Sequence, residues 1–474
     1  MVRRTFAFHL DRAAMTGFAG AGPGFAGTGP GFAGTGPGFA RAGQRVNWAG
    51  NIAFTAPEFH RPATLGELRA VVGRARQVRV LGTGHSFNEM ADSPGAQVSL
   101  ADLPPEVDFD SAASLVRVTA GLSYATLAAR LDRQGLALRN MASLPHISVA
   151  GAVATGTHGS GTANQSLSAA VAGLELVTAD GGVVELSRSD DASFPGAVVH
   201  LGALGVVTRL ILAVVPSFEV SQRVYEELPL EVLDDHFAPI MASGYSVSMF
   251  TDWRAPRLTQ LWIKSLVDDT SSTSLAPATP SVTPASPVTE EPWFTATPAP
   301  AARNPVPGVA ADSCTEQLGV PGPWFERLPH FRPDFTPSAG DELQSEYLLP
   351  AEHAVPALHA LSRISERLAS AVRICEVRRV AADDLWLSMA YQQDSVAFHF
   401  TWIPDTAAVL PVVTDLERQL APFGPRPHWG KVFTTPAAEL HARYDRLPDF
   451  LSLARHYDPA GKFRNAYTAR VLER

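Results

Sequence analysis

The amino-acid sequence predicts an α+β fold with two domains, and three observations support this prediction. The chain has 474 residues, 46% of them hydrophobic, which is enough for two or three domains and a large core. Between residues 46 and 212, short β-branched runs alternate with segments of helical periodicity. Beyond Ile211, polar and apolar residues alternate with the period of antiparallel strands.

Charge and cysteine content exclude several classes of protein. The net charge is −9, whereas a surface that binds nucleic acid or anionic lipid needs clustered Lys and Arg. No apolar run reaches the ~18 residues that a membrane-spanning helix requires. The two cysteines, Cys314 and Cys375, are too few and too far apart for a disulfide framework or a zinc site. We therefore expect no nucleic acid, membrane or metal partner, and two buried free thiols.

Residues 1–43 differ in composition from the rest of the chain. Residues 1–15 carry arginines but lack the apolar core of a secretory signal, so we expect a cytoplasmic protein. A seven-residue repeat of Gly, Phe, Ala and Pro follows, and this composition predicts a disordered leader. Residues 22–27 spell the dinucleotide motif G-x-G-x-x-G, but no strand precedes them and no helix follows, so we expect no binding there.

The ordered elements begin near Val46. Thr64, with Glu67 three residues later, predicts the start of a helix that extends to about residue 75. Asp180-Gly181-Gly182 predicts a hairpin between two strands. The other elements predicted up to residue 212 are strands at 78–81, 97–100, 115–118, 174–178, 183–186 and 206–208, and a helix at 123–131. The pattern suggests two small βαβ-like units around a ligand.

Two glycine-rich segments carry the predicted binding site. The strand at 78–81 leads into Gly82-Thr83-Gly84-His85-Ser86, where glycines permit φ > 0 and expose backbone N–H groups that can bind phosphate oxygens. Taken alone, this loop fits an ordinary turn with a surface histidine equally well. The second segment, 141–161, consists mostly of small uncharged residues. We expect it to form no stable helix and to lie against something flat and polar.

Together the two segments resemble the FAD-binding domain of the vanillyl-alcohol oxidase flavoprotein family, in which a G-x-G-H-S loop holds the pyrophosphate. Residues 47–51, 245–254, 314–329, 343–348 and 428–433 extend the likeness to the alditol (sugar-alcohol) oxidase branch. The resemblance implies a two-domain fold, with an FAD-binding domain and an antiparallel-sheet substrate-binding cap domain. The implied boundaries are 44–212 for the FAD domain, 213–430 for the cap, and 431–474 for a segment returning to the FAD domain. Residues 268–307, rich in Ser, Thr and Pro, are expected to be a surface linker inserted into the cap.

The resemblance also implies the cofactor, FAD, and a covalent bond from His85 to the 8α-methyl group of its ring. Family members with a second covalent link supply a cysteine from the segment that corresponds to 141–161, and this segment has none. The implied cofactor-binding residues are Leu81, Gly82, Thr83, Gly84, His85, Ser86, Phe87, Ser143, Ser148, Gly151, Thr155, Gly156, Thr157, His158 and Val206.

Candidate catalytic residues lie on the later strands of the predicted cap. Period-two alternation places Glu376 with Arg378 on one strand face, and His399 with Thr401 on another. Considered singly, each of them is more often simply solvated. The resemblance implies that Glu376, Arg378, Thr401, Lys431 and Ser143 line a polyol pocket. We expect Arg378 and Lys431 to stabilise a developing alkoxide and Glu376 to orient hydroxyl groups, with His399 as the next candidate for the proton acceptor.

The expected function is that of an FAD-dependent oxidase. It would convert the terminal primary alcohol of alditols such as xylitol or sorbitol to the aldose and reduce O2 to H2O2, acting as a monomer. An aldonolactone oxidase or dehydrogenase of the same family is the alternative enzyme, and a non-catalytic binding protein with the same fold is the alternative from another class. The sequence contains no H-E-x-x-H, P-loop or G-x-S-x-G motif.

Overall fold

The structure is a computed structural model that describes residues 39–40, 44–267, 294–335 and 341–473. Most of the predicted leader lies outside the described residues. Its described part, β1 (Phe39–Ala40), pairs with β2 (Gln44–Arg45) in antiparallel fashion. None of the helices in these ranges combines the length and apolar character needed to cross a bilayer.

The N-terminal half begins with a small parallel sheet in the order β3 (Glu58–His60), β5 (Ala96–Val98), β4 (Val78–Val80). The helix α1 (Leu65–Arg74) connects β3 to β4. The Thr64 side chain accepts a hydrogen bond from the N–H of Glu67 at 3.2 Å, which confirms the predicted cap. The strand β4 ends where the glycine-rich loop begins.

A second sheet follows in the order β10 (Val183–Ser187), β9 (Val171–Val177), β11 (Val206–Ala213), β7 (Leu115–Thr119), β6 (Val107–Asp110). All of its pairings are antiparallel. The predicted hairpin is confirmed, since Val177 pairs with Val183. The prediction of two βαβ-like units was wrong for this sheet, because strands joined by so tight a turn must run antiparallel. The helices α2 (Tyr124–Asp132), α3 (Val149–Ala154) and α4 (Phe194–Val198) complete this half.

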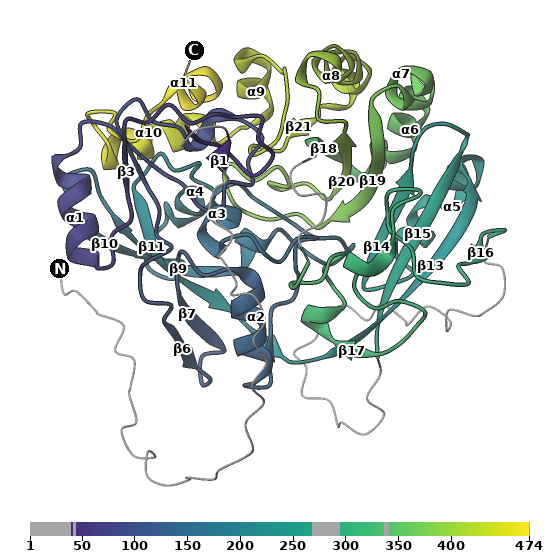
Figure 1. Cartoon of the computed structure of the whole chain (residues 1–474), viewed down its shortest axis with the longest axis horizontal. Coiled ribbons are helices and arrows are strands. Elements are labelled where there is room, and N and C mark those ends of the chain that lie inside the picture. Colours follow the sequence, from purple (N-terminus) through teal and green to yellow (C-terminus); the bar gives the residue numbers. More distant parts are fainter. Residues whose placement is uncertain (1–38, 41–43, 268–293, 336–340, 474) are drawn as a thin grey trace, which may run out of the picture.

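The second half is built on a larger sheet, in which every pairing is antiparallel. We call it the large sheet. Figure 1 shows it in teal and green beside the N-terminal half. Its strands are β13 (Glu219–Pro229), β14 (Ser246–Thr251), β15 (Arg257–Leu266), β16 (Thr297–Pro298), β17 (Gly322–Pro323), β18 (Leu343–Pro350), β19 (Val372–Val380), β20 (Ser395–Trp402) and β21 (Arg426–Pro427).

Helices cover the large sheet and connect it to the N-terminal half. The helix α6 contacts both α5 and α8, while α5 contacts β14 and α7 contacts β19. The chain then crosses back, and in Figure 1 the yellow helices α10 and α11 lie next to the first strands. The bounds are α5 (Leu233–Met241), α6 (Ala354–Ser362), α7 (Ser365–Ala369), α8 (Thr406–Leu420), α9 (Ala437–Arg443), α10 (Leu447–Tyr457) and α11 (Ala466–Leu472).

The buried guanidinium of Arg79 helps to hold the returning segment in place. It donates to the carbonyl oxygens of Met90, Leu201, Gly202 and Phe463. Three separate parts of the chain therefore meet on the strand that leads into the glycine-rich loop. Burial lowers the pKa of Arg79 to about 10, which leaves it charged at neutral pH.

Two predictions need correction. Residues 141–161 were expected to form no helix, yet they contain α3, which buries Val149, Ala152 and Val153 in the core. Tertiary packing outweighs the weak helix propensity here. Residues 294–307 were expected to belong to an extended surface linker, but β16 pairs with β13, and Ala296, Ala299 and Asn304 are buried.

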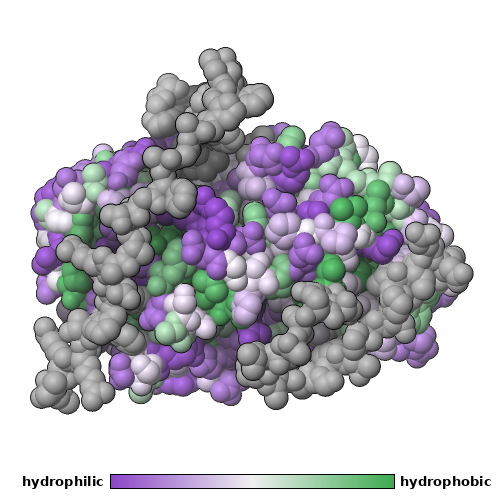
Figure 2. Space-filling model, turned by 90° about the horizontal axis from the view of Figure 1, so that it is seen from below, coloured by the Kyte–Doolittle hydropathy of each residue, from purple (hydrophilic) through white to green (hydrophobic). Residues whose placement is uncertain are grey.

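The core is continuous through both halves. A smaller cluster, which includes Phe250, Trp262 and Cys314, packs on the other side of the large sheet's central strands. Cys314 and Cys375 are buried and free, as expected. On the face in Figure 2, hydrophilic residues cover much of the described surface, with smaller hydrophobic areas between them.

Candidate active site

A cavity of about 1060 Å³ lies between the two halves of the molecule. Ligand pockets usually measure about 300–1,000 Å³, so this cavity has room for a dinucleotide and a small substrate together. One side is formed by the two glycine-rich segments, and the other by strands of the large sheet with Lys431. We call these the loop wall (residues 82–86 and 143–157) and the ionic wall (Glu346, Glu376, Arg378, His399 and Lys431).

The structure brings nearly all of the predicted site residues to this cavity. The exceptions are Gly156 and Val206. A Cβ on Gly156 would lie 3.3 Å from Cε of Met389, and Val206 is buried in β11, although its neighbours Gly205 and Val207 line the cavity. The predicted residues that line it are Leu81, Gly82, Thr83, Gly84, His85, Ser86, Phe87, Ser143, Ser148, Gly151, Thr155, Thr157, His158, Glu376, Arg378, His399, Thr401 and Lys431.

The loop wall presents backbone N–H groups that have no partner among the described residues. The N–H of Leu81 donates to the carbonyl of Val98 (2.8 Å), and that of Phe87 to the carbonyl of Gly430 (2.7 Å). The amides of residues 82–86 between them have no hydrogen-bond partner in the part of the chain that the structure describes. Gly84 has φ +74°, a conformation that turns the loop and that other residues rarely adopt. Such a row of free donors suits an anionic group such as a pyrophosphate.

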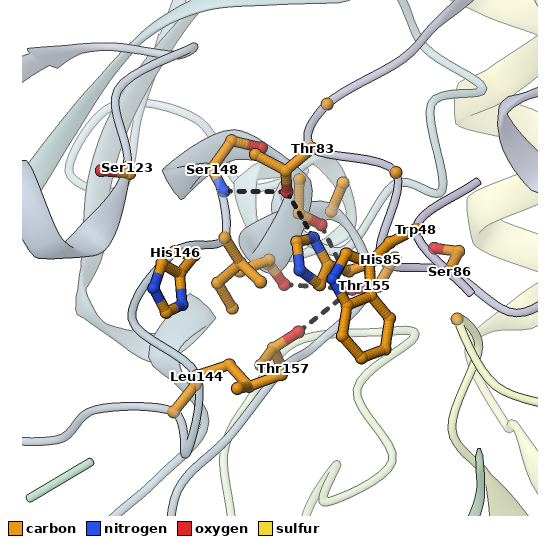
Figure 3. Close-up of a pocket in the computed structure, with 18 of the residues that line it drawn as sticks. Trp48, Thr83, His85, Ser86, Ser123, Leu144, His146, Ser148, Thr155 and Thr157 are labelled. Atoms are coloured by element: carbon orange, nitrogen blue, oxygen red, sulfur yellow. Dashed lines mark hydrogen bonds between the residues drawn. The ribbon is translucent and has the colours of Figure 1, made fainter. Parts of the chain in front are cut away.

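The two segments of the loop wall pack closely because glycine stands at the contact points. A Cβ on Gly82 would lie 2.6 Å from Oγ of Ser148, and a Cβ on Gly151 would lie 2.7 Å from the same atom. The N–H of Ser148 is 3.4 Å from Oγ1 of Thr83. Figure 3 shows the side chains of this wall gathered around one space. The surface is uncharged and lined with hydroxyl groups.

His85 is held in one orientation within this wall. Its Nδ1 lies 3.0 Å from Oγ1 of Thr83, and its ring stacks on Trp48 with a centroid distance of 5.2 Å and an interplanar angle of 20° (Figure 3). Burial lowers the pKa of His85 to about 4, and nearby His146 adds to the effect. The imidazole is therefore neutral at pH 7, with a ring nitrogen available as a nucleophile.

The ionic wall is centred on Glu346 of β18, which the sequence prediction missed. Its carboxylate pairs with Arg378, and its Oε2 lies 2.8 Å from Nζ of Lys431. Its Oε1 lies 3.3 Å from Nε2 of His158, a predicted cofactor residue. Burial alone would raise the pKa of Glu346, but the charges of Lys431 and Arg378 hold it well below its usual value. Glu346 is therefore ionised.

Glu376 is the second buried carboxylate of the ionic wall. Its Oε1 lies 2.7 Å from Nε2 of His330, and its Oε2 lies 3.4 Å from Nδ1 of His399 and 3.6 Å from Nε of Arg378. Burial opposes ionisation, but Arg378 and His330 hold the pKa of Glu376 well below its usual value. Two carboxylates thus balance the two cations, and the ionic wall carries no net charge.

Two buried polar atoms of the ionic wall have no hydrogen-bond partner among the described residues: Nε2 of His399 and Nε of Arg378. Burial lowers the pKa of His399 to about 4, with Lys431 contributing in the same direction, so its ring is neutral. If Nδ1 carries the proton and faces Glu376, Nε2 keeps a free lone pair. Buried polar atoms are normally satisfied. Both residues line the cavity through other atoms, so a ligand hydroxyl could meet these two nitrogens only after a small shift of the side chains.

Lys431 is positioned by the loop that follows His85. The amide of Asn88 donates to the carbonyls of Trp429 (2.8 Å) and Lys431 (3.0 Å). The N–H of Val432 donates to the carbonyl of Gln344 in β18 (2.8 Å). Burial lowers the pKa of Lys431, and Glu346 opposes this shift. Asn88 thus fixes the backbone from which the ammonium group reaches Glu346.

The comparisons with known proteins agree with this geometry. Residues 58–187 match a family described as FAD binding domain, and residues 341–471 match D-arabinono-1,4-lactone oxidase. The chain is 54% identical to alditol oxidase from Streptomyces sp. (strain IKD472 / FERM P-14339), over 90% of this chain and 98% of that protein. This chain belongs to the alditol oxidase branch of the vanillyl-alcohol oxidase flavoprotein family.

More distant relatives of this flavoprotein act on lactones. L-gulono-1,4-lactone dehydrogenase from Mycobacterium tuberculosis (strain ATCC 25618 / H37Rv) is 29% identical to it, over 90% of this chain and 98% of that protein. Among solved structures, cholesterol oxidase from B. sterolicum superposes with a TM-score of 0.70 at 14% identity, over 90% of this chain and 96% of that one. The predicted α+β fold is therefore confirmed.

FAD is the cofactor of this flavoprotein, and the loop wall fits it. The amides of residues 82–86, which have no partner in the described part of the chain, suit the pyrophosphate, and the uncharged surface of residues 148–157 suits an aromatic ring system. The sequence could have pointed to Glu346, because it is the only charged residue of β18, a strand that is mostly buried. A charge buried in this way is usually paired.

Proposed function

We propose that this flavoprotein is an oxidase that converts the terminal primary alcohol of alditols, such as xylitol and sorbitol, to the aldose while reducing O2 to H2O2. The observation that carries the proposal is the ionic wall, which is neutral overall yet leaves Nε2 of His399 and Nε of Arg378 unpartnered among the described residues. A site with balanced charges suits an uncharged, hydroxyl-rich substrate better than an anion. The similarity to alditol oxidase supports the same substrate class.

The residues divide the work of binding and activation. Glu376 accepts hydrogen bonds from substrate hydroxyls, with Thr401 and Ser143 as further partners at the cavity. Arg378 and Lys431 stabilise the negative charge that develops on the reacting oxygen, because fixed donors in a largely dry site need no reorganisation. Glu346 holds both cations in place through direct ion pairs.

The hydroxyl proton needs an acceptor, and His399 is the residue we assign. Its ring is neutral at pH 7 because burial lowers its pKa to about 4. With Nδ1 facing Glu376 at 3.4 Å, the unpartnered Nε2 can receive the proton. Bound FAD supplies the hydride acceptor and the route of the electrons to O2. We also propose that His85 carries the covalent bond to FAD.

An aldonolactone oxidase or dehydrogenase is the second candidate. The match of residues 341–471 to D-arabinono-1,4-lactone oxidase favours it, because these residues include Glu346, Glu376, Arg378 and Lys431. A lactone substrate would use the same fold and cofactor. The two candidates therefore differ in which compound reduces the flavin.

The visible spectrum of the purified holoenzyme separates these functions. We expect xylitol, added without oxygen, to bleach the flavin absorbance, and air to restore it with formation of H2O2. The same experiment is repeated with L-gulono-1,4-lactone at the same concentration. Bleaching by the lactone alone would favour the second candidate, and bleaching by neither compound would favour a binding protein.

We further propose that the active unit is a single chain, because residues from both halves of the same chain enclose the cavity. Light scattering of the active holoenzyme should give the mass of one chain. A mass of two chains that persists on dilution would contradict this proposal.

A further inference from the structure

Next to His330, and outside the set of residues that line the cavity, is a buried lysine that the reaction scheme above does not use. Lys264 stands on β15 and is 1% exposed. Its Nζ lies 2.8, 2.5 and 3.0 Å from the carbonyl oxygens of Arg327, Leu328 and Pro329. The fourth neighbour is Nδ1 of His330, at 3.2 Å. The lysine therefore faces four atoms that can accept hydrogen bonds.

The imidazole of His330 joins this lysine to Glu376. Its Nε2 lies 2.7 Å from Oε1 of Glu376. The ring of Trp262 packs against it at a centroid distance of 5.1 Å and an angle of 62°, and that of Phe250 at 5.8 Å and 64°. Enclosed in this way, the imidazole cannot turn over, so each of its nitrogens has a fixed partner.

The same segment also holds the opposite side of the substrate site. The backbone N–H groups of His330 and Phe331 point to the carbonyl of Ser143, at 3.2 and 3.3 Å. Ser143 belongs to the loop wall, and Glu376 to the ionic wall. His330 therefore contacts both walls, one through its backbone and the other through its ring.

Hydrogen-bond chemistry decides where the proton of His330 lies. An ammonium group has no lone pair, so a proton on Nδ1 of His330 would point at a cation that cannot accept it, and Nδ1 is left unprotonated. The three N–H donors of Lys264 are shared among the three carbonyls and Nδ1. A neutral imidazole that accepts at Nδ1 carries its proton on Nε2, and Nε2 then donates to Glu376. A lysine facing three carbonyls and a ring nitrogen thus selects one tautomer.

We propose that Lys264 and His330 are positioning residues for substrate binding: Lys264 fixes the tautomer of His330, which donates to Oε1 of Glu376 and leaves Oε2 to bind a substrate hydroxyl. The inference rests on the proposed function, in which Glu376 binds the polyol. Without the lysine, the three carbonyls would favour a proton on Nδ1 of His330. Nε2 would then face the carboxylate of Glu376 with a lone pair, unless the ring took up a second proton and became a cation.

The charged groups around this pair fix the direction of the pH effect. His330 faces Lys264 on β15 and Glu376 and Arg378 on β19, and burial lowers its pKa. Lys264 faces Glu376 and Cys314, and burial lowers its pKa to about 7. In the wild type His330 donates to Glu376 as a neutral ring. In Lys264→Met the ring must take a second proton to do so, so substrate binding by the variant should weaken as pH rises from 5 to 6, a range in which Lys264 of the wild type is still charged.

The first arm of the test is ¹⁵N NMR of the holoenzyme labelled at its histidine rings, without substrate. We expect His330 to show a protonated Nε2 and an unprotonated Nδ1 at pH 6, and its signals are identified by their loss in His330→Gln. A proton on Nδ1, or on both nitrogens, would overturn the proposal. This arm needs neither the variant of Lys264 nor a polyol, so it decides the matter even if that variant does not fold or the substrate is another compound.

The second arm is kinetic, with xylitol as the probe. We expect Lys264→Met to lower kcat/KM ~10–100-fold, the effect of losing a hydrogen bond to a charged group. The loss should appear mainly in KM and should be larger at pH 6 than at pH 5. Lys462→Met is the control, because Lys462 also donates to backbone carbonyls, those of Val72 and Gly73, and none of its side-chain hydrogen bonds within the described residues goes to an imidazole. If xylitol reduces the flavin of the wild type and KM is unchanged in Lys264→Met, the proposal is contradicted. If xylitol does not reduce the flavin of the wild type, the proposed function is contradicted instead.

Discussion

The two walls of the cavity bind by opposite means. The loop wall carries no full charge and leaves backbone donors unpartnered within the described residues. The ionic wall carries four buried charges, and each of them is paired. The first wall is contributed by short continuous stretches of chain, whereas Glu346, Glu376 and Lys431 are far apart in the sequence.

The difference shows how each wall obtains its affinity. Free N–H groups attract an anion directly. The loop conformation that keeps them free costs little conformational free energy, because glycine permits it. Buried charges are costly to desolvate, so they persist only where partners hold them. The ionic wall therefore depends on every member of its set, and the loop wall on the shape of its backbone.

The largest effect is expected from Glu346→Gln. It leaves Arg378 and Lys431 buried without their shared anion, and breaking a buried ion pair in this way typically costs about 3–5 kcal/mol of stability. The measurement is the free energy of unfolding in denaturant. Glu417→Gln is the matched control, because Glu417 accepts from the neutral hydroxyls of Tyr347 and Thr434. Equal losses in both variants would mean that charge balance does not matter.

The next effect is on the rate of flavin reduction. Arg378→Ala and Lys431→Met should retain FAD but be reduced by xylitol at least ~100-fold more slowly, since each removes a donor to the developing negative charge. Glu376→Gln should also raise KM, because Glu376 holds hydroxyls in the ground state as well. Anaerobic stopped flow measures these rates. Near-normal reduction of the arginine and lysine variants would place the stabilising groups elsewhere.

On the loop wall, His85→Ala should remove the covalent link while FAD binding persists. The backbone donors of residues 82–86 do not depend on the imidazole. After acid precipitation, we expect the yellow colour to remain with the wild-type protein and to pass into the supernatant for the variant. Colour in the wild-type supernatant would refute the covalent bond.

Acid should destabilise both walls through buried neutral histidines. Burial lowers the pKa of His200, beside the loop wall, and of His399 to about 4, whereas an unfolded histidine titrates near ~6.5. The unfolded state therefore takes up protons first, and stability falls as pH drops from about 6.5 to 4, by up to ~2 kcal/mol per group at pH 5. Melting temperatures at pH 7 and 5 should show the loss, and His200→Gln should reduce it. A melting temperature that is constant over this range would disprove the assignment.

Sequence reasoning recovered the loop wall more fully than the ionic wall. The cap at Thr64, the hairpin at Asp180-Gly181-Gly182 and the loop at Gly82 depend on neighbouring residues, so local pattern predicts them. Glu346 and His330 act through partners on other strands, and period-two alternation indicates a strand face but not which strands lie side by side. Helix α3 was missed because its stability comes from packing rather than from its own sequence.

The most direct test of charge balance in the ionic wall is a double-mutant cycle of Glu346→Gln and Lys431→Met. If the two residues form one balanced unit, removing both should cost less than the sum of the single losses, with a coupling of about 0.5–3 kcal/mol in the free energy of unfolding. The double variant should then be more stable than Glu346→Gln alone. Additive losses would contradict the view that these charges are retained as a balanced set.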